Sequence, residues 1–333
     1  MKTKKLKVIV VFVLILLVLA LTKKNIQQGY RASKENVESS LDITKGLTLE
    51  SISRTTLYKG FDLLNKIVLK KGSDGNWILE SRFNAPGRKD LVEGFLRELR
   101  DLKGELRADS KELLGDFQID DATGLHIILE SGEGKVLKHL VVGLKKPGLN
   151  GNFVRVYDSN KVLLVSNELL MRLALFNNES PLLDNNFLDL RILSFDPKEV
   201  NRIEVGGSFT KIPLTLVREE SKDKNAAPVW KFDHSRQKGD IDTAKVGLFL
   251  QNASTLWAQQ VLDPTPATYG FEKPFLNMKL VLSSGQALGL ILGAPLAMEK
   301  THYAKTSPKN LVYKVTDSIT SNILKDSSNF VRR

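Results

Sequence analysis

Histidine is the residue type in this chain best suited to general acid–base or metal chemistry, because its ordinary pKa lies near neutrality. The chain contains four histidines. They stand at His126, His139, His234 and His302. Their spacing matches neither H-x-x-H nor H-x-E, the patterns that would bring two ligands, or a ligand and a base, together on one element. We therefore interpret all four as structural histidines and assign them no catalytic or metal-binding role.

The carboxylates form no recognisable metal or acid–base site either. Asp116, Asp120 and Asp121 gather just before a short alternating stretch, but a calcium loop needs a fixed pattern of oxygen ligands such as D-x-[DN]-x-[DN]-G. A polar turn is the prediction for this segment. Carboxylate pairs of the glycosidase type depend on the geometry of a whole fold, which local spacing does not reveal.

Several enzyme classes are excluded by missing residues or motifs. The chain has no cysteine, which excludes disulfides, thiol nucleophiles and thiolate zinc sites. The nucleotide motifs G-x-x-x-x-G-K-[ST] and G-x-G-x-x-G do not occur, and neither does the nucleophile motif G-x-S-x-G. We predict that the protein is not an enzyme and has no catalytic residues, no cofactor and no metal. A hydrolase with an unfamiliar site is the remaining catalytic alternative.

The positive charge of the chain is concentrated at its N-terminus. The formal net charge is +11. Residues 1–34 hold eight basic side chains and no acidic one, which leaves +3 (11 minus 8) for the rest of the chain. A nucleic-acid-binding domain would instead carry its basic excess on the folded part. We therefore predict no nucleic-acid partner.

The N-terminal charges flank an unbroken apolar run, Val8–Thr22. As a helix this run spans about 22 Å, and flanking lysines can snorkel to extend it towards the ~30 Å hydrocarbon core of a bilayer. We predict that residues 1–24 are an uncleaved signal anchor in contact with inner-membrane lipid, with the N-terminus cytoplasmic and the bulk of the chain periplasmic or extracellular. A cleaved signal peptide is the alternative. Residues 25–54 are polar and are predicted to form a spacer.

The remaining chain repeats one pattern of residues at an offset of about 150 positions. Trp77 recurs as Trp230 after 153 residues, and Gly143 recurs as Gly293 after 150. Other matched pairs are Phe95 and Phe249, Phe117 and Phe271, Gly132 and Gly285, and Val162 and Val312. The first strand of each copy departs from this offset, since FDLLNKIVL aligns with FDPKEVNRIEV at a distance of 136, from Ile67 to Ile203. The offset between matched residues stays nearly constant through many elements. This constancy predicts a duplicated domain.

In this alignment no histidine faces another histidine, which supports structural roles for all of them. The alignment places His126 opposite Lys279, His139 opposite Gly289, His234 opposite Ser81, and His302 opposite Asn152. Trp77, Trp230 and Trp257 are predicted to be core residues. An exposed pair of equivalent tryptophans would instead suggest a platform for glycans.

Each copy reads as two strands, a long amphipathic helix, several alternating strands and a closing helix. The predicted fold class is α+β, with an N-terminal transmembrane helix followed by two tandem repeats, each a mostly antiparallel sheet with a helix packed on one face. The predicted domains are the anchor (residues 1–24), the spacer (residues 25–54), a first repeat (residues 55–186) and a second repeat (residues 187–333).

Several motifs make the chain similar to a known family. The N-terminal anchor, the Trp-centred strand, YGFEKP, LILGAP, THYAK and LVYKVT resemble the bacterial domain-of-unknown-function 4340 family over about residues 55–330. The first copy departs from the pattern, because LLGDFQIDD lacks its Tyr and Pro. Members of this family are membrane-tethered envelope proteins, often found beside ABC-transporter components of the gliding-motility type. The resemblance implies an accessory role near a transporter and carries over no catalytic residue.

Two functions follow from these observations. The first is a non-enzymatic, membrane-tethered envelope protein that serves as an accessory or scaffold subunit of an ABC-type transporter or gliding-motility-like complex. The alternative is a periplasmic binding module for polysaccharide or lipid, which would need an exposed aromatic groove or an apolar cavity. The sequence does not identify a ligand.

Overall fold

The computed structural model describes residues 40–143, 150–176, 180–210, 212–219, 229–233, 239–296 and 298–332. The predicted anchor, residues 1–24, lies outside the described residues. Within the described part, no helix combines the length and the apolar character that a membrane crossing requires. These residues divide into two compact units, one within residues 40–68 and 90–183 and the other within residues 69–89 and 184–332.

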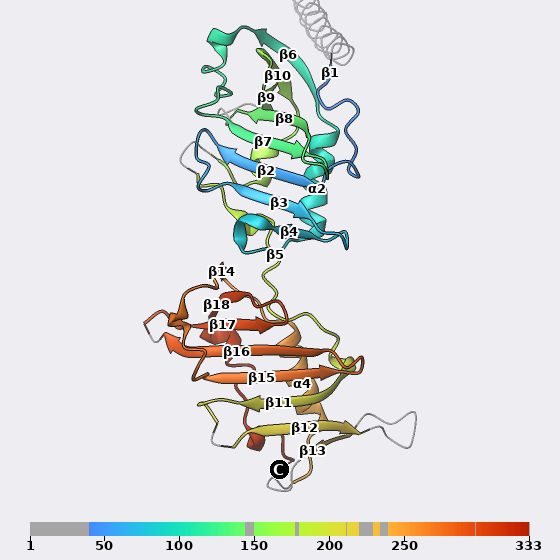
Figure 1. Ribbon diagram of the computed structural model, residues 1–333, viewed down its shortest axis with the longest axis vertical. Coiled ribbons are helices and arrows are strands. Elements are labelled where there is room, and N and C mark those ends of the chain that lie inside the picture. The colour runs from blue at the N-terminus through green and yellow to red at the C-terminus, as the bar shows by residue number, and fades with distance from the viewer. Residues whose placement is uncertain are drawn as a thin grey trace, which may run out of the picture. The chain divides into compact units, whose positions relative to one another are not determined.

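A mostly antiparallel sheet of ten strands, the first sheet, is built from residues 41–165 (Figure 1). Its strands lie in the order β1-β6-β10-β9-β8-β7-β2-β3-β4-β5. Their bounds are β1 (Leu41–Asp42), β2 (Arg54–Lys59), β3 (Ile67–Lys71), β4 (Trp77–Leu79), β5 (Ala85–Pro86), β6 (Lys103–Asp109), β7 (Leu125–Glu130), β8 (Val136–Val142), β9 (Asn152–Val156) and β10 (Lys161–Val165).

An antiparallel sheet of eight strands, the second sheet, follows in residues 200–316. Its strands lie in the order β13-β12-β11-β15-β16-β17-β18-β14. Their bounds are β11 (Val200–Gly206), β12 (Leu214–Glu219), β13 (Val229–Phe232), β14 (Gln260–Leu262), β15 (Leu276–Leu282), β16 (Ala287–Leu296), β17 (Thr301–Ser307) and β18 (Val312–Thr316). Strand β15 alternates between buried and more exposed residues, the period of two that lets a sheet bury one face.

Two helices of twelve residues each, α2 (Lys89–Arg100) and α4 (Thr243–Ser254), follow β5 and β13. Figure 1 shows α2 behind the strands of the first sheet and α4 behind those of the second. Asp242 begins α4 by accepting hydrogen bonds from the backbone N–H groups of Ala244 and Lys245. Shorter helices are α3 (Leu169–Arg172), α5 (Asp317–Thr320) and the 3-10 turns η1 (Glu80–Arg82), η2 (Lys111–Leu113), η3 (Asp184–Asn186), η4 (Pro197–Glu199), η5 (Ala267–Tyr269) and η6 (Ser327–Asn329). The predicted α+β class with mostly antiparallel sheets is confirmed.

The two sheets share one strand order. The run β4-β3-β2-β7-β8-β9-β10-β6 of the first sheet corresponds, place for place, to β13-β12-β11-β15-β16-β17-β18-β14 in the second. The helices also occupy matching places along the chain. Helix α2 precedes β6, as α4 precedes β14, and α3 follows β10, as α5 follows β18. Positions in one sheet can therefore be compared with positions in the other through their cross-strand partners.

This correspondence corrects the alignment of the first strand. Strand β11 lies between β12 and β15, just as β2 lies between β3 and β7. The counterpart of β11 is therefore β2 (Arg54–Lys59), and the pairing of Ile67 in β3 with Ile203 in β11 was wrong by one strand. The error arose because neighbouring short apolar strands look alike in sequence, whereas long-range pairing decides which of them is equivalent.

The packed structure begins earlier than the sequence predicted. Leu41 of β1 pairs with Gly104 of β6, and Ile43 and Ile52 are buried. Part of the predicted spacer, residues 25–54, is therefore folded where the structure describes it. Its apolar residues are too few and too widely spaced to signal a strand before the partner strand is known.

Two of the three tryptophans are core residues as predicted. Trp77 is 2% exposed and Trp230 is 4% exposed, so neither forms a glycan platform. Trp257 is 43% exposed, and its predicted place in the core is wrong. It pairs with Arg191 through an isolated β-bridge, and this extended stretch after α4 leaves its side chain open to solvent.

Gly143 and Gly293 occupy the same crowded corner of the two sheets. A Cβ atom at Gly143 would overlap the carbonyl oxygen of Phe117, and one at Gly293 would overlap that of Tyr269. The backbone of the segment before β7 or β15 therefore reaches the sheet only because glycine has no side chain. Because both carbonyls lie against the equivalent glycine, the counterpart of Phe117 is Tyr269 and not Phe271, with which the sequence alignment matched it.

We expect Gly293→Ala to destabilise the chain by about 2 kcal/mol, because a methyl group there must displace a backbone carbonyl. The matched control is Gly247→Ala in α4, where an added Cβ meets nothing within 4 Å. That control should stabilise the chain by about 0.5–1 kcal/mol through helix propensity. Urea denaturation of both variants measures the difference, and equal stability of the two would contradict the proposed crowding.

Candidate functional site

Four aromatic side chains from adjacent strands meet on one face of the first sheet and form what we term the ring cluster: Tyr58, His126, His139 and Tyr157. Tyr58 stacks on His126 with ring centroids 4.6 Å apart, and His139 stacks on Tyr157 at 4.1 Å. The two stacks are joined by a 3.0 Å hydrogen bond between His126 Nδ1 and His139 Nε2. The sequence motifs did not reveal this pair, since a hairpin brings together residues that lie thirteen positions apart.

The hydrogen bonds of the cluster fix the tautomers of both histidines. His126 Nε2 lies 3.0 Å from the carbonyl oxygen of Asp121, an acceptor, so this nitrogen carries the proton. In a neutral ring Nδ1 of His126 must then accept, and Nε2 of His139 donates to it. Burial lowers the pKa of His126, and burial together with the nearby His126 and Arg155 lowers the pKa of His139 to about 4. Both rings are therefore neutral near pH 7.

Arg155 lies beside the ring cluster and is fully engaged by protein groups. Its side chain is 4% exposed. Nε donates to the carbonyl oxygen of Ile119 at 2.6 Å, and the guanidinium also bonds the carbonyl of Tyr157 and the carboxylate of Asp121. The guanidinium carbon lies 5.5 Å from the centre of the Tyr157 ring. The donors and the charge of Arg155 are thus bonded within the protein, so this cation does not serve a ligand.

The predicted polar turn of the acidic segment is confirmed. The carboxylate of Asp120 accepts hydrogen bonds from the backbone of Ala122 and Thr123 and from the Thr123 hydroxyl, while Asp121 pairs with Arg155. Among the described residues, no group of three or more His, Asp or Glu side chains is arranged to hold a metal ion.

Cross-strand partners identify the positions of the second sheet that match the ring cluster. Tyr58 pairs with His126, as Gly206 pairs with Asn277. The backbone N–H of Tyr157 donates to the carbonyl of His139, and Ser307 pairs with Gly289 in the same way across β16 and β17. Arg155 lies across from Val141, and Lys305 lies across from Ile291. The counterparts of Tyr58, His126, His139, Tyr157 and Arg155 are therefore Gly206, Asn277, Gly289, Ser307 and Lys305.

One of these assignments corrects the sequence alignment, which placed Lys279 opposite His126. The counterpart is Asn277, two residues earlier. The alignment matched Gly132 with Gly285, but the glycine with positive φ at the turn of the first hairpin is Gly134, at +79°, as Gly285 is at +83° in the second. A bulge between Leu129 and Glu130 adds one residue to β8 of the first hairpin, so the offset is 151 at His126 and 150 at His139.

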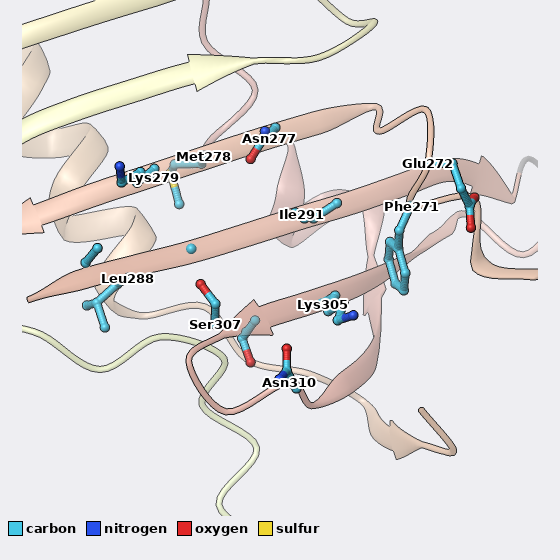
Figure 2. A pocket seen from close by; sticks show the side chains of 13 residues that line it. Phe271, Glu272, Asn277, Met278, Lys279, Leu288, Ile291, Lys305, Ser307 and Asn310 are labelled. Carbon is cyan, nitrogen blue, oxygen red and sulfur yellow. The ribbon is translucent and has the colours of Figure 1, made fainter. Parts of the chain in front are cut away.

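The second sheet has a pocket where the first sheet has its rings. It measures about 530 Å³ and is formed by β15, β16, β17 and two adjoining loops (Figure 2). Gly289 and Ser307, which line the pocket, hold the positions of His139 and Tyr157, and Gly206 holds the position of Tyr58. The lining residues are Phe271, Glu272, Asn277, Met278, Lys279, Ala287, Leu288, Gly289, Ile291, Lys305, Thr306, Ser307 and Asn310.

Apolar and cationic side chains dominate the chemistry of this pocket. Phe271 and Ile291 supply apolar surface, and Figure 2 shows Lys279 and Lys305 on different strands around Ile291. Among the described residues, neither lysine has a carboxylate within ion-pair distance. Asn277, Ser307 and Asn310 add hydrogen-bonding groups. The arrangement can bind a ligand, and its lining contains no histidine and only one carboxylate, that of Glu272.

A comparison with protein families identifies this architecture. The model described as "Domain of unknown function (DUF4340)" matches residues 77–274, more than half of the chain. The chain belongs to the DUF4340 family. The match ends before β15 and therefore leaves out most of the pocket. No curated protein and no solved structure matches the chain.

The third described histidine of this DUF4340 protein has a structural role. His302 is buried, and its Nδ1 lies 3.1 Å from the carbonyl oxygen of Gly293, while Nε2 lies 3.3 Å from the carboxylate of Asp317. Its counterpart Asn152 donates to the carbonyl of Gly143 at 3.5 Å and accepts from the backbone N–H of Leu170 at 3.4 Å. Each residue thus ties its glycine to the following short helix.

The predicted match of His302 with Asn152 is confirmed by these bonds. The cross-strand partners of Gly289 and His139 confirm their match as well. His234 lies outside the described residues.

We expect the stability of the DUF4340 protein to fall with acid through His139. Its pKa is about 4 in the folded chain and about 6.5 when unfolded. Protonation therefore favours unfolding, so the contribution is complete above about pH 6.5 and is lost as the pH falls towards 4. The loss is about 2 kcal/mol, because a half-buried group realises only part of the 1.36 kcal/mol per pKa unit.

Urea denaturation of the wild type and His139→Gln between pH 7.5 and pH 4.5 measures this loss. The Gln side chain can donate the same hydrogen bond to His126 but does not titrate. The stability advantage of the wild type should shrink as the pH falls, whereas parallel curves for the two proteins would rule out His139 as the source.

Proposed function

We propose that this DUF4340 protein is a non-enzymatic binding protein of the bacterial envelope. Residues 1–24 hold it in the inner membrane as a single-pass anchor, with the N-terminus cytoplasmic and the folded part periplasmic or extracellular. The two sheets, each with its long helix, are copies of one ancestral domain, and the second copy binds a polysaccharide or lipid for a membrane complex. The shared strand order of the two sheets supports the duplication.

The observation that carries this proposal is the pocket of the second sheet. Its volume of about 530 Å³ lies within the 300–1,000 Å³ range of small-molecule sites. Its lining joins apolar surface to a few amide, hydroxyl and ammonium groups, which suits binding. General acid–base catalysis usually needs a pair of groups with opposed roles, and the lining offers lysines and a single carboxylate instead.

A second observation supports an accessory or scaffold role in an ABC-type transporter or gliding-motility-like complex. A turn after β2 exposes three large apolar side chains: Phe61 is 76%, Leu63 56% and Leu64 97% exposed. Apolar residues grouped on one turn cost free energy in water and suit a protein–protein contact. This turn, which we term the apolar turn, would be the surface that contacts another subunit.

If the pocket binds a ligand in the cell, the chain purified from its host should carry it. We expect native mass spectrometry of the full chain to detect a bound small molecule in the wild type. Gly289→His gives position 289 the side chain that its counterpart His139 has in the first sheet. The added ring should fill the pocket and abolish the mass of the bound molecule. Gly247→Ala, on the exposed side of α4, should retain it. Equal ligand content in both variants would refute a role for the pocket.

If the apolar turn contacts a complex, a photo-crosslinking amino acid at Leu64 should capture subunits of that complex in living cells. Leu248 of α4 is also exposed, at 60%, and provides the control position. We expect membrane-transporter subunits among the crosslinks from position 64 and not from position 248. Crosslinks that are the same from both positions would count against the scaffold role.

A further inference from the structure

We infer that the pocket of the second sheet takes an anionic lipid-like molecule, in which one acidic group adjoins an apolar body. The inference rests on the proposed function and specifies its ligand. It depends on three features of the pocket: the placement of two lysines, the loss of side-chain volume between them, and the apolar surface at their side.

The strand register places the two lysines at opposite corners of the pocket. Lys279, Gly289 and Ser307 form one row across β15, β16 and β17, and Asn277, Ile291 and Lys305 form the next row on the same face. Neighbouring strands lie about 4.8 Å apart and alternate residues about 7 Å apart. The lysine Cα atoms are therefore about 12 Å apart across the diagonal, and their flexible stems can direct both ammonium groups to an anion over Gly289.

The first sheet explains why these cations remain available. Arg155, at the position of Lys305, is buried and bonds Asp121 and two carbonyl groups. Lys305 has no such carboxylate partner among the described residues. Glu272 is the one acidic residue of the lining, and Figure 2 shows it beyond Phe271, at the far end of the pocket from Lys279. Glu204 lies opposite Lys279 on β11 but is paired with Arg202, so the charge around Gly289 favours an anion.

The absent side chains expose an apolar floor. A Cβ on Gly289 would overlap the Ser307 hydroxyl, so a single small hydroxyl stands at this row where the first sheet holds the rings of His139 and Tyr157. Ala287 and Ile291 lie on the same face of β16 as Gly289 and line the pocket together with Phe271. An alkyl or acyl body gains about 25 cal/mol per Å² of contact with such a surface. A sugar would leave many hydroxyl groups without partners against it.

Isothermal titration calorimetry of the full chain in nanodiscs of neutral phosphatidylcholine tests the inference. The probes are hexyl phosphate, hexanol, inorganic phosphate and glucuronate. We expect binding of hexyl phosphate alone, with affinity reduced about tenfold or more by Lys305→Ala or Lys279→Ala, the loss of one charge-assisted contact. Gly289→His should abolish binding. Lys198→Ala, an exposed lysine of η4 outside the pocket, should leave it unchanged.

The other outcomes overturn the inference in distinct ways. Equal binding of hexanol would show that the anionic group is not recognised, and equal binding of inorganic phosphate or glucuronate would show that the apolar body is not. If no probe binds while native mass spectrometry still finds a Gly289-dependent ligand, the lipid class is wrong and the proposed function stands. If both experiments find nothing in the pocket, both fail together.

Discussion

The contact of Gly143 and Gly293 with a backbone carbonyl is the constraint on which the rest of each sheet depends. Because a Cβ would overlap the carbonyl of Phe117 or Tyr269, only glycine lets the preceding segment lie against the sheet. The carbonyl of the same glycine accepts a hydrogen bond from Asn152 or lies against the His302 ring. One backbone position thus joins the covering segment, the central strands and the closing helix, and it fixes the face next to it.

On that fixed face, side-chain volume alone separates a packed cluster from an open pocket. In the first sheet a hydrogen bond between His126 and His139 joins two stacked ring pairs, and the buried Arg155 guanidinium bonds the carbonyl of Tyr157. Each aromatic pair contributes about 0.5–1.5 kcal/mol beyond the burial of its area. The second sheet gives up these contacts where Gly206, Gly289 and Ser307 replace the rings. A loss of packing that leaves an open, partly apolar surface is typical of sites that trade stability for binding.

The sequence predicted the elements better than their partners. Its offset of 150 correctly matched Gly143 with Gly293 and His302 with Asn152, because loops do not change length between those strands. It failed where register depends on a turn: the positive φ of Gly134, matched with that of Gly285, replaces Lys279 with Asn277 as the counterpart of His126. The contact of His126 with His139 was missed for the same reason. Two histidines on facing strands of a hairpin meet only if the register is known, and cross-strand pairing is not a local property of the sequence.

The contrast between Arg155 and Lys305 adds an argument against catalysis that is independent of any motif. A guanidinium is planar and suits fixed, buried partners, whereas an ammonium on a flexible stem suits a charge that must meet a ligand from solvent. Enzymes usually place groups of shifted pKa in an open cleft. Here the histidines of lowered pKa lie in the closed cluster, with His126 bonded on both nitrogens. The open pocket presents lysines and amides instead. That separation of titrating groups from open space supports the proposal that this DUF4340 protein binds its ligand without changing it.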